Sequence, residues 1–187
     1  MDIRLHYLEK GKGTPLLLLH GNGENADYFE HQISFFSEKY HVYALDTRGH
    51  GKSPRGEAPF TLEQFALDLE AFMDEKGLEQ ADILGFSDGA NIALLFALRH
   101  PRRVGRLILN GANLFPKGVK NSVQLPIIMG YLMVSLIALF SKKAVPNKEM
   151  LGLMVTQPHI DPEELLSLQM PVLVIAGTRD MIRLSHT

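Results

Sequence analysis

Short apolar runs that alternate with helical segments most limit the folds open to this chain of 187 residues. A run that is apolar at every position is typical of a strand buried on both faces of a sheet. The predicted strands lie at 3–8, 15–19, 41–45, 81–84, 107–110 and 171–176. The predicted helices between them lie at 26–39, 61–76 and 90–99. This order predicts an α/β fold with a mostly parallel, twisted sheet that is flanked by helices.

Composition excludes several classes of protein. The apolar fraction of 45% and the charged fraction of 21% are typical of a soluble globular chain. A formal net charge of −2 argues against nucleic acid as a partner. Because the chain has no cysteine, it has no disulfide and no thiolate metal site. The N-terminus lacks the long apolar region of a signal peptide, so we expect a cytoplasmic location, with no cofactor and no metal.

Residues 85–89 read Gly-Phe-Ser-Asp-Gly, directly after a predicted strand and directly before a predicted helix. A serine nucleophile must project clear of the sheet, and this spacing suits a sharp strand-to-helix turn that is too tight for side chains at its flanking positions. We therefore predict that Ser87 is a catalytic nucleophile. The alternative is an ordinary strand-to-helix turn in which Ser87 only caps the helix.

Four motifs together resemble the α/β-hydrolase superfamily, in the branch that uses a serine nucleophile. They are His-Gly-Asn-Gly at 20–23, Asp-Thr-Arg-Gly-His-Gly-Lys-Ser at 46–53, the 85–89 segment, and Val-Ile-Ala-Gly-Thr-Arg-Asp at 174–180. Their order along the chain and their positions after predicted strands carry the resemblance. It implies an α/β-hydrolase fold.

The resemblance also implies an oxyanion hole formed by two backbone N–H groups. Asn22 is the first choice for one donor, and Gly23 is the second. Asp88, the residue after the nucleophile, supplies the other, at the positive end of a helix. The alternative is that the glycines of 20–23 only permit a turn. His20 is expected to organise this loop rather than to take part in catalysis.

Residues 49–53, Gly-His-Gly-Lys-Ser, look like the end of a phosphate-binding loop. Such a loop needs a glycine where this chain has Asp46, and it must lead into a helix. Pro54, Gly56 and Pro59 oppose a helix there, so we do not expect nucleotide binding. We expect a structural loop with Arg48 in a local ion pair.

Asp180 follows the last predicted strand, where the resemblance places the acid that orients the catalytic histidine. The alternative is a helix-capping role. The base is expected beyond a further helix and a final strand, whereas only seven residues follow Asp180. His186 is therefore a poor candidate. We expect a chain truncated at its C-terminus, without the last helix-strand-helix part of the fold, and nearly inactive toward esters.

The predicted domains are an α/β-hydrolase core at 1–113 and 169–187 and a helical cap insertion at 114–168. Within the insertion, residues 127–140 are apolar at twelve of fourteen positions, fewer than the roughly 20 that a membrane span needs. We expect this helix to be buried or to cover a pocket. A membrane span and an oligomer contact are the alternatives.

The sequence as a whole predicts a hydrolase of carboxylic esters or related acyl and carbonyl substrates, acting by a Ser-His-Asp mechanism whose histidine is absent from this chain. The expected partner is a small apolar acyl or carbonyl compound, and the exposed sheet edge at 171–176 predicts homo-oligomers. The alternative is a non-catalytic protein that binds a small ligand on a hydrolase scaffold. The sequence does not separate ester from lactone, thioester or C–C cleavage.

Overall fold

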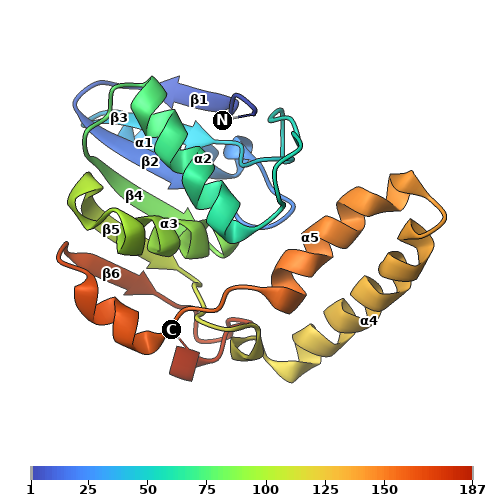
Figure 1. Ribbon diagram of the computed structural model, residues 1–187. Helices are drawn as coiled ribbons and strands as arrows, with labels where there is room; N and C mark the ends of the chain where they lie inside the picture. Colours follow the sequence, from blue (N-terminus) through green and yellow to red (C-terminus); the bar gives the residue numbers. More distant parts are fainter. Residues whose placement is uncertain (1, 187) are drawn as a thin grey trace.

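Six strands form one sheet in the computed structural model, which describes residues 2–186 (Figure 1). The order across the sheet is β1-β3-β2-β4-β5-β6, in which β1 is antiparallel to β3 and every other pair is parallel. The strands are β1 (Tyr7–Lys10), β2 (Thr14–Leu19), β3 (Tyr40–Leu45), β4 (Ala81–Phe86), β5 (Val104–Asn110) and β6 (Val172–Ile175). The predicted α/β architecture is therefore confirmed.

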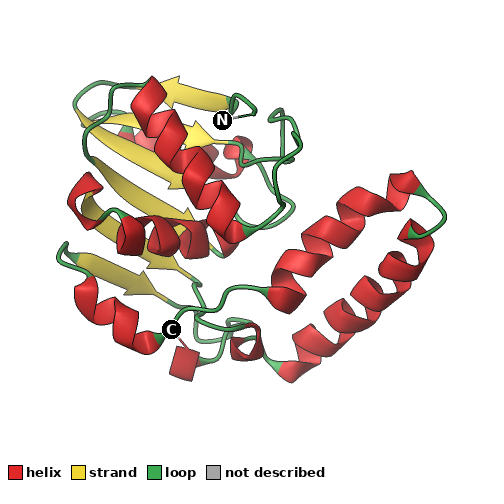
Figure 2. Ribbon diagram, viewed as in Figure 1, coloured by secondary structure: helices red, strands yellow, loops and turns green. Residues whose placement is uncertain are grey.

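Helices lie on both faces of the sheet (Figure 2). On one face, Leu17 and Leu19 of β2 belong to the apolar core shared with α2 and α3, and on the other face Leu16 and Leu18 pack with residues around α1. This alternation follows from the two-residue period of a strand. The helices next to the sheet are α1 (Glu30–Phe36), α2 (Leu62–Glu75) and α3 (Asp88–Arg99), with short 3₁₀ turns η1 (Ala26–Phe29) and η2 (Pro101–Arg103).

The predicted ends of α2 are confirmed. The Thr61 side chain accepts a hydrogen bond from the N–H of Gln64, as an N-cap residue does. Gly77 follows the helix with φ +65°, a conformation that glycine adopts without strain. The helix expected at 26–39 is instead divided into η1 and α1.

The first strand differs from the prediction of 3–8, because β1 begins only at Tyr7. Ile3 and Leu5 are buried in the core as an alternating pattern requires. However, the backbone of His6 bonds to the loop after β3 rather than to a strand. Its N–H donates to Ser53 Oγ at 2.8 Å, and its carbonyl accepts from the N–H of Asp46 at 2.9 Å.

A helical hairpin extends from the end of the sheet at which the parallel strands finish (Figure 1). It consists of η3 (Pro116–Gly118), α4 (Asn121–Ala138), η4 (Lys142–Ala144) and α5 (Val145–Thr156). The chain returns to β6 through η5 (Pro162–Ser167) and ends the described part with η6 (Leu184–His186). The apolar helix at 127–140 was expected to be buried or to cover a pocket. Its residues are not buried, since Gln124 is the only buried residue of α4, and the pocket-covering role stays a prediction.

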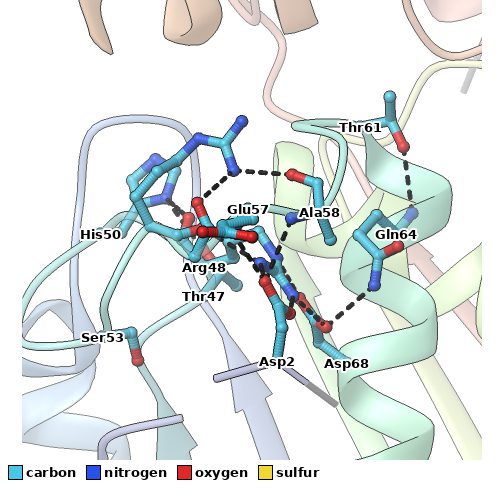
Figure 3. Close-up of polar contacts among 12 residues, drawn as sticks. Asp2, Thr47, Arg48, His50, Ser53, Glu57, Ala58, Thr61, Gln64 and Asp68 are labelled. Atoms are coloured by element: carbon cyan, nitrogen blue, oxygen red, sulfur yellow. Dashed lines mark hydrogen bonds and ion pairs between the residues drawn. The ribbon is translucent and has the colours of Figure 1, made fainter. Parts of the chain in front are cut away.

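One buried ion cluster joins the N-terminal segment, the loop after β3 and α2 (Figure 3). The fully buried Arg48 guanidinium donates twice to Asp68, both at 2.7 Å, and twice to Asp2, at 2.6 and 3.0 Å. Its fifth N–H donates to the carbonyl of Arg55 at 3.0 Å. Burial opposes the charge, but the Asp68 and Asp2 carboxylates raise the pKa of Arg48 above its usual range. The predicted ion pair of Arg48 is confirmed.

Replacing Arg48 by methionine should destabilise the fold strongly, because it leaves the buried Asp68 carboxylate without its partner. We expect the free energy of unfolding in urea to fall by about 3–5 kcal/mol. Arg4→Met is the control, since that side chain is 80% exposed and pairs at 2.8 Å with the partly exposed Glu75, and it should cost less than about 1 kcal/mol. Similar losses in the two variants would contradict a structural role for the cluster.

The outer edge of β6 pairs with no strand within residues 2–186, and all four of its residues are exposed. Beside it lies an apolar hollow of about 430 Å³, where the sheet face away from α2 and α3 is uncovered. Its strand residues include Leu84, Ile108, Leu173 and Ile175. An unpaired apolar edge can pair with the same edge of another chain. We propose that two copies associate through β6.

Leu173→Lys tests this association, since it places a charge on the exposed edge without disturbing the buried core. Sedimentation velocity at rising concentration should show association for the original chain and a monomer for the variant. Leu67→Lys, at an exposed position of α2, should associate like the original chain. A strict monomer at every concentration of the original chain would contradict the proposal.

Candidate active site

Ser87 occupies the sharp turn between β4 and α3. It has φ 53° and ψ −119°, and it is the only residue other than glycine with positive φ in the described part of the chain. A side chain at Gly85 would lie 2.2 Å from the carbonyl oxygen of Gly89, and one at Gly89 would lie 2.1 Å from that of Leu19. The two glycines therefore allow α3 to begin directly against β2 and β4. Such a backbone conformation costs about 1–3 kcal/mol and is often found at functional sites.

The loop after β2 lies against Ser87. A Cβ at Gly21 would be 3.2 Å from the Cβ of Ser87, since β2 and β4 are neighbours in the sheet. Within residues 2–186, the backbone N–H groups of Asn22, Gly23 and Asp88 donate no hydrogen bond. Asp88 begins α3, so its N–H lies at the positive end of the helix dipole. Backbone N–H groups without a hydrogen-bond partner among the described residues therefore occur in both of the segments that were predicted to form the oxyanion hole.

The side chain of Asn22 forms a contact that sequence reasoning missed. Its Nδ2 donates to Asp88 Oδ2 and to the carbonyl of Met150 in α5, both at 2.9 Å. Burial raises the pKa of the Asp88 carboxyl, and the Asn22 hydrogen bond opposes that rise. One amide therefore ties the loop after β2 to the residue after Ser87 and to the hairpin. No sequence pattern indicates this bond, because Met150 takes part through its backbone.

A second contact joins the hairpin to the core. Arg55 donates to Glu149 through Nε at 2.8 Å and through Nη2 at 2.6 Å. The pKa of Arg55 is raised chiefly by this bidentate pair. Nearby, the side chain of Gln157 accepts a hydrogen bond at 2.8 Å from the N–H of Leu62 in α2. These contacts hold α5 beside the loop after β3.

Asp180 follows β6 and lies at the same end of the parallel strands as Ser87. Asn110, Phe86 and Ile175 occupy matching positions at the ends of three adjacent strands, and Ser87 donates its N–H to the carbonyl of Asn110 at 2.8 Å. The Asp180 carboxylate accepts from the N–H of Ile182 at 3.0 Å, so it also stabilises its own turn.

No histidine hydrogen-bonds to Ser87 or to Asp180 within residues 2–186. His186 lies in η6, where its ring packs against Gly118 and lies 6.3 Å from the ring of Phe115. His100, at the end of α3, approaches Glu70 at 3.3 Å. The described residues also hold no cluster of three side chains suited to a metal.

His20 is buried and organises the loop that carries Asn22. Its Nδ1 donates to the carbonyl of Gly21 at 2.7 Å, while its Nε2 accepts from the N–H of Thr47 at 3.1 Å. This arrangement needs the neutral ring. Burial lowers the pKa of His20 to about 4, and burial also lowers the pKa of the neighbouring His50, whose ring is 5.3 Å away. Both rings are therefore neutral at pH 7, in agreement with the expected structural role of His20.

The low pKa of His20 predicts an acid-sensitive fold. Between about pH 4 and 6.5 the unfolded histidine binds a proton that the folded one does not, so stability falls as pH falls through this window. This group contributes up to about 3 kcal/mol. His20→Gln keeps an acceptor for the N–H of Thr47 but does not titrate. Urea unfolding should show a weaker pH dependence for this variant, while the exposed His31→Gln should match the original chain. An equal dependence in all three would contradict the assignment.

Comparisons with known proteins agree with this geometry. A sequence model of the alpha/beta hydrolase fold family matches residues 14–142. The (E)-2-((N-methylformamido)methylene)succinate hydrolase of Acinetobacter baylyi is 36% identical over 107 residues, which cover 57% of this chain and 41% of that protein. The 3-oxoadipate enol-lactonase 2 of the same species is 32% identical over 110 residues, which cover 58% of this chain and 41% of that protein.

Among solved structures, that of a membrane phospholipase A described as a bacterial virulence factor superposes with a TM-score of 0.77 and 25% identity. The match covers 98% of this chain and 73% of that one. The aligned parts of six curated relatives span only 28% to 42% of those proteins. The family match nevertheless covers more than half of this chain, and the sheet order and the Ser87 turn agree with it. The chain belongs to the alpha/beta hydrolase fold family.

Proposed function

We propose that this chain belongs to a serine hydrolase that cleaves carboxylic esters or related acyl and carbonyl compounds. The observation that carries the proposal is the conformation of Ser87, held at φ 53° between Gly85 and Gly89. A strained serine at the end of a central strand, next to free backbone N–H groups, suits nucleophilic attack on a carbonyl.

The proposed reaction begins when Ser87 Oγ bonds to the carbonyl carbon of the substrate and loses its proton to a base. The carbonyl π electrons move to oxygen, and the N–H groups of Asn22 and Asp88 stabilise that negative charge. Collapse of this intermediate breaks the bond to the alcohol, which takes the proton from the base. Water then releases the acid by the same two steps. Asp180 would orient the histidine that serves as base.

The relatives support the class of substrate. Both curated relatives described above are named as hydrolytic enzymes, and a lactone is a cyclic ester. The phospholipase A that superposes on this chain is also named for an esterase reaction. The alternative proposal is non-catalytic binding of a small apolar ligand on the same scaffold.

Hydrolysis of p-nitrophenyl acetate by the 187-residue chain distinguishes these functions when imidazole is added as an external base. Without imidazole we expect a rate close to that of Ser87→Ala, because loss of the base costs on the order of 10⁶ in kcat. With imidazole, the original chain should exceed Ser87→Ala by a margin that grows with imidazole concentration.

Ser122→Ala, at an exposed position of α4, is the matched control and should behave like the original chain. Equal rates for the original chain and Ser87→Ala at every imidazole concentration would contradict the nucleophile and favour the binding function. Rapid turnover without imidazole that depends on Ser87 would instead contradict the expected inactivity of this chain.

A further inference from the structure

The outer face of α4 is apolar and exposed. Its side chains are between 57% and 87% exposed and recur at the three- and four-residue spacing of one helix face. They are Leu125, Met129, Leu132, Met133 and Leu136 of α4, together with Phe140, two residues beyond the end of the helix. We call these six residues the apolar stripe. A surface helix of a globular protein normally places polar residues on this side, so the stripe reverses the usual pattern.

The opposite face of α4 already has a partner in α5. Gln124 Nε2 donates to the carbonyl of Met154 at 3.1 Å, and Tyr131 lies against Gly152. Figure 1 shows α4 on the outer side of the hairpin, with α5 nearer to the sheet. The stripe therefore faces away from the core, and within residues 2–186 nothing covers it.

The charges around the stripe are all positive. From residue 115 to residue 148 the chain contains five lysines and no aspartate, glutamate or arginine. This segment therefore carries +5, whereas the rest of the chain carries −7. Lys117 and Lys120 precede α4, Lys142 and Lys143 follow it, and Lys148 lies in α5 next to Glu149. A helix with an apolar face and flanking lysines has the features of a helix that lies in the surface of an anionic lipid bilayer.

We propose that the hairpin docks the protein on an anionic lipid surface, with the apolar stripe among the acyl chains and the flanking lysines among the headgroups. A second copy of the chain fits the stripe less well, because two such segments would bring ten positive charges together. The helix is long and apolar enough to cross a membrane by length and composition alone. However, the Arg55–Glu149 pair and the Asn22–Met150 bond hold α5 to the core, so the hairpin lies along the surface.

This inference concerns binding and does not depend on the chemistry at Ser87. The test is cosedimentation of the 187-residue chain with vesicles of phosphatidylcholine alone or of an equal mixture with phosphatidylglycerol. We expect binding to the mixed vesicles, weaker binding to phosphatidylcholine, and loss of binding as salt screens the lysines. Lys142→Ala combined with Lys143→Ala should weaken binding about 25-fold, since each lysine near such a surface contributes about fivefold.

Leu132→Ser combined with Leu136→Ser should weaken binding to the mixed vesicles by about tenfold or more, since both side chains lose their apolar contact with lipid. Two matched double variants should bind like the original chain. They are Lys12→Ala with Lys39→Ala, and Leu166→Ser with Leu184→Ser, all at exposed positions outside the hairpin. Circular dichroism checks that every variant is folded, as expected for exposed positions.

Several results would overturn the proposal. Equal binding to both kinds of vesicle would remove the role of the lysines. Protein that stays with the vesicles at alkaline pH would indicate a membrane span instead. Association in the absence of lipid that is abolished by the Leu132 and Leu136 changes, but not by Leu173→Lys, would identify a second copy as the occupant of the stripe.

Discussion

The close approach of α3 to β2 and β4 is the constraint on which the candidate site depends. Gly89 lies so near the backbone of Leu19 that even a methyl group would collide with it, and Gly85 is equally restricted by Gly89. The chain can make this approach only through a sharp turn, which Ser87 completes with a positive φ. The same turn directs the start of α3 toward the loop after β2. The nucleophile position and the free N–H of Asp88 are thus two results of one packing contact.

Much of the fold follows from local patterns, because buried parallel strands and capped helices have strong signals in the sequence. Such signals predict that Thr61 begins α2, that Gly77 ends it, and that the glycines around Ser87 form a sharp turn. The start of β1 is not, because Ile3 shows the same alternation whether its neighbours pair with a strand or with a loop. In the same way, the Asn22 amide bonds to a residue 128 positions away, and no local pattern carries that information.

The hairpin shows where periodicity reaches its limit. A helix that is apolar on all sides has no preferred face, so its sequence does not tell which side meets a neighbour. In the structure, α5 selects one side through the contacts of Gln124 and Tyr131 and leaves the apolar stripe outside. Burial of this helix is not observed for this reason, since α5 covers only one face of α4, and its role as a cover over a pocket stays a prediction. The five lysines of the segment indicate a binding surface only when the exposed face of α4 is also known.

The hairpin forms two polar contacts with the loops that follow β2 and β3. Asn22 holds Met150 by one hydrogen bond, and Arg55 holds Glu149 by a partly exposed ion pair. Contacts of this kind contribute about 1 kcal/mol each, far less than a buried apolar interface of comparable extent. Leu153 of α5 is buried in the main apolar core, so these polar contacts set the orientation of α5 more than its attachment, and a partner bound to the hairpin could shift that orientation. Since the same Asn22 amide also bonds to Asp88, any such shift would reach the residues on both sides of the proposed oxyanion position.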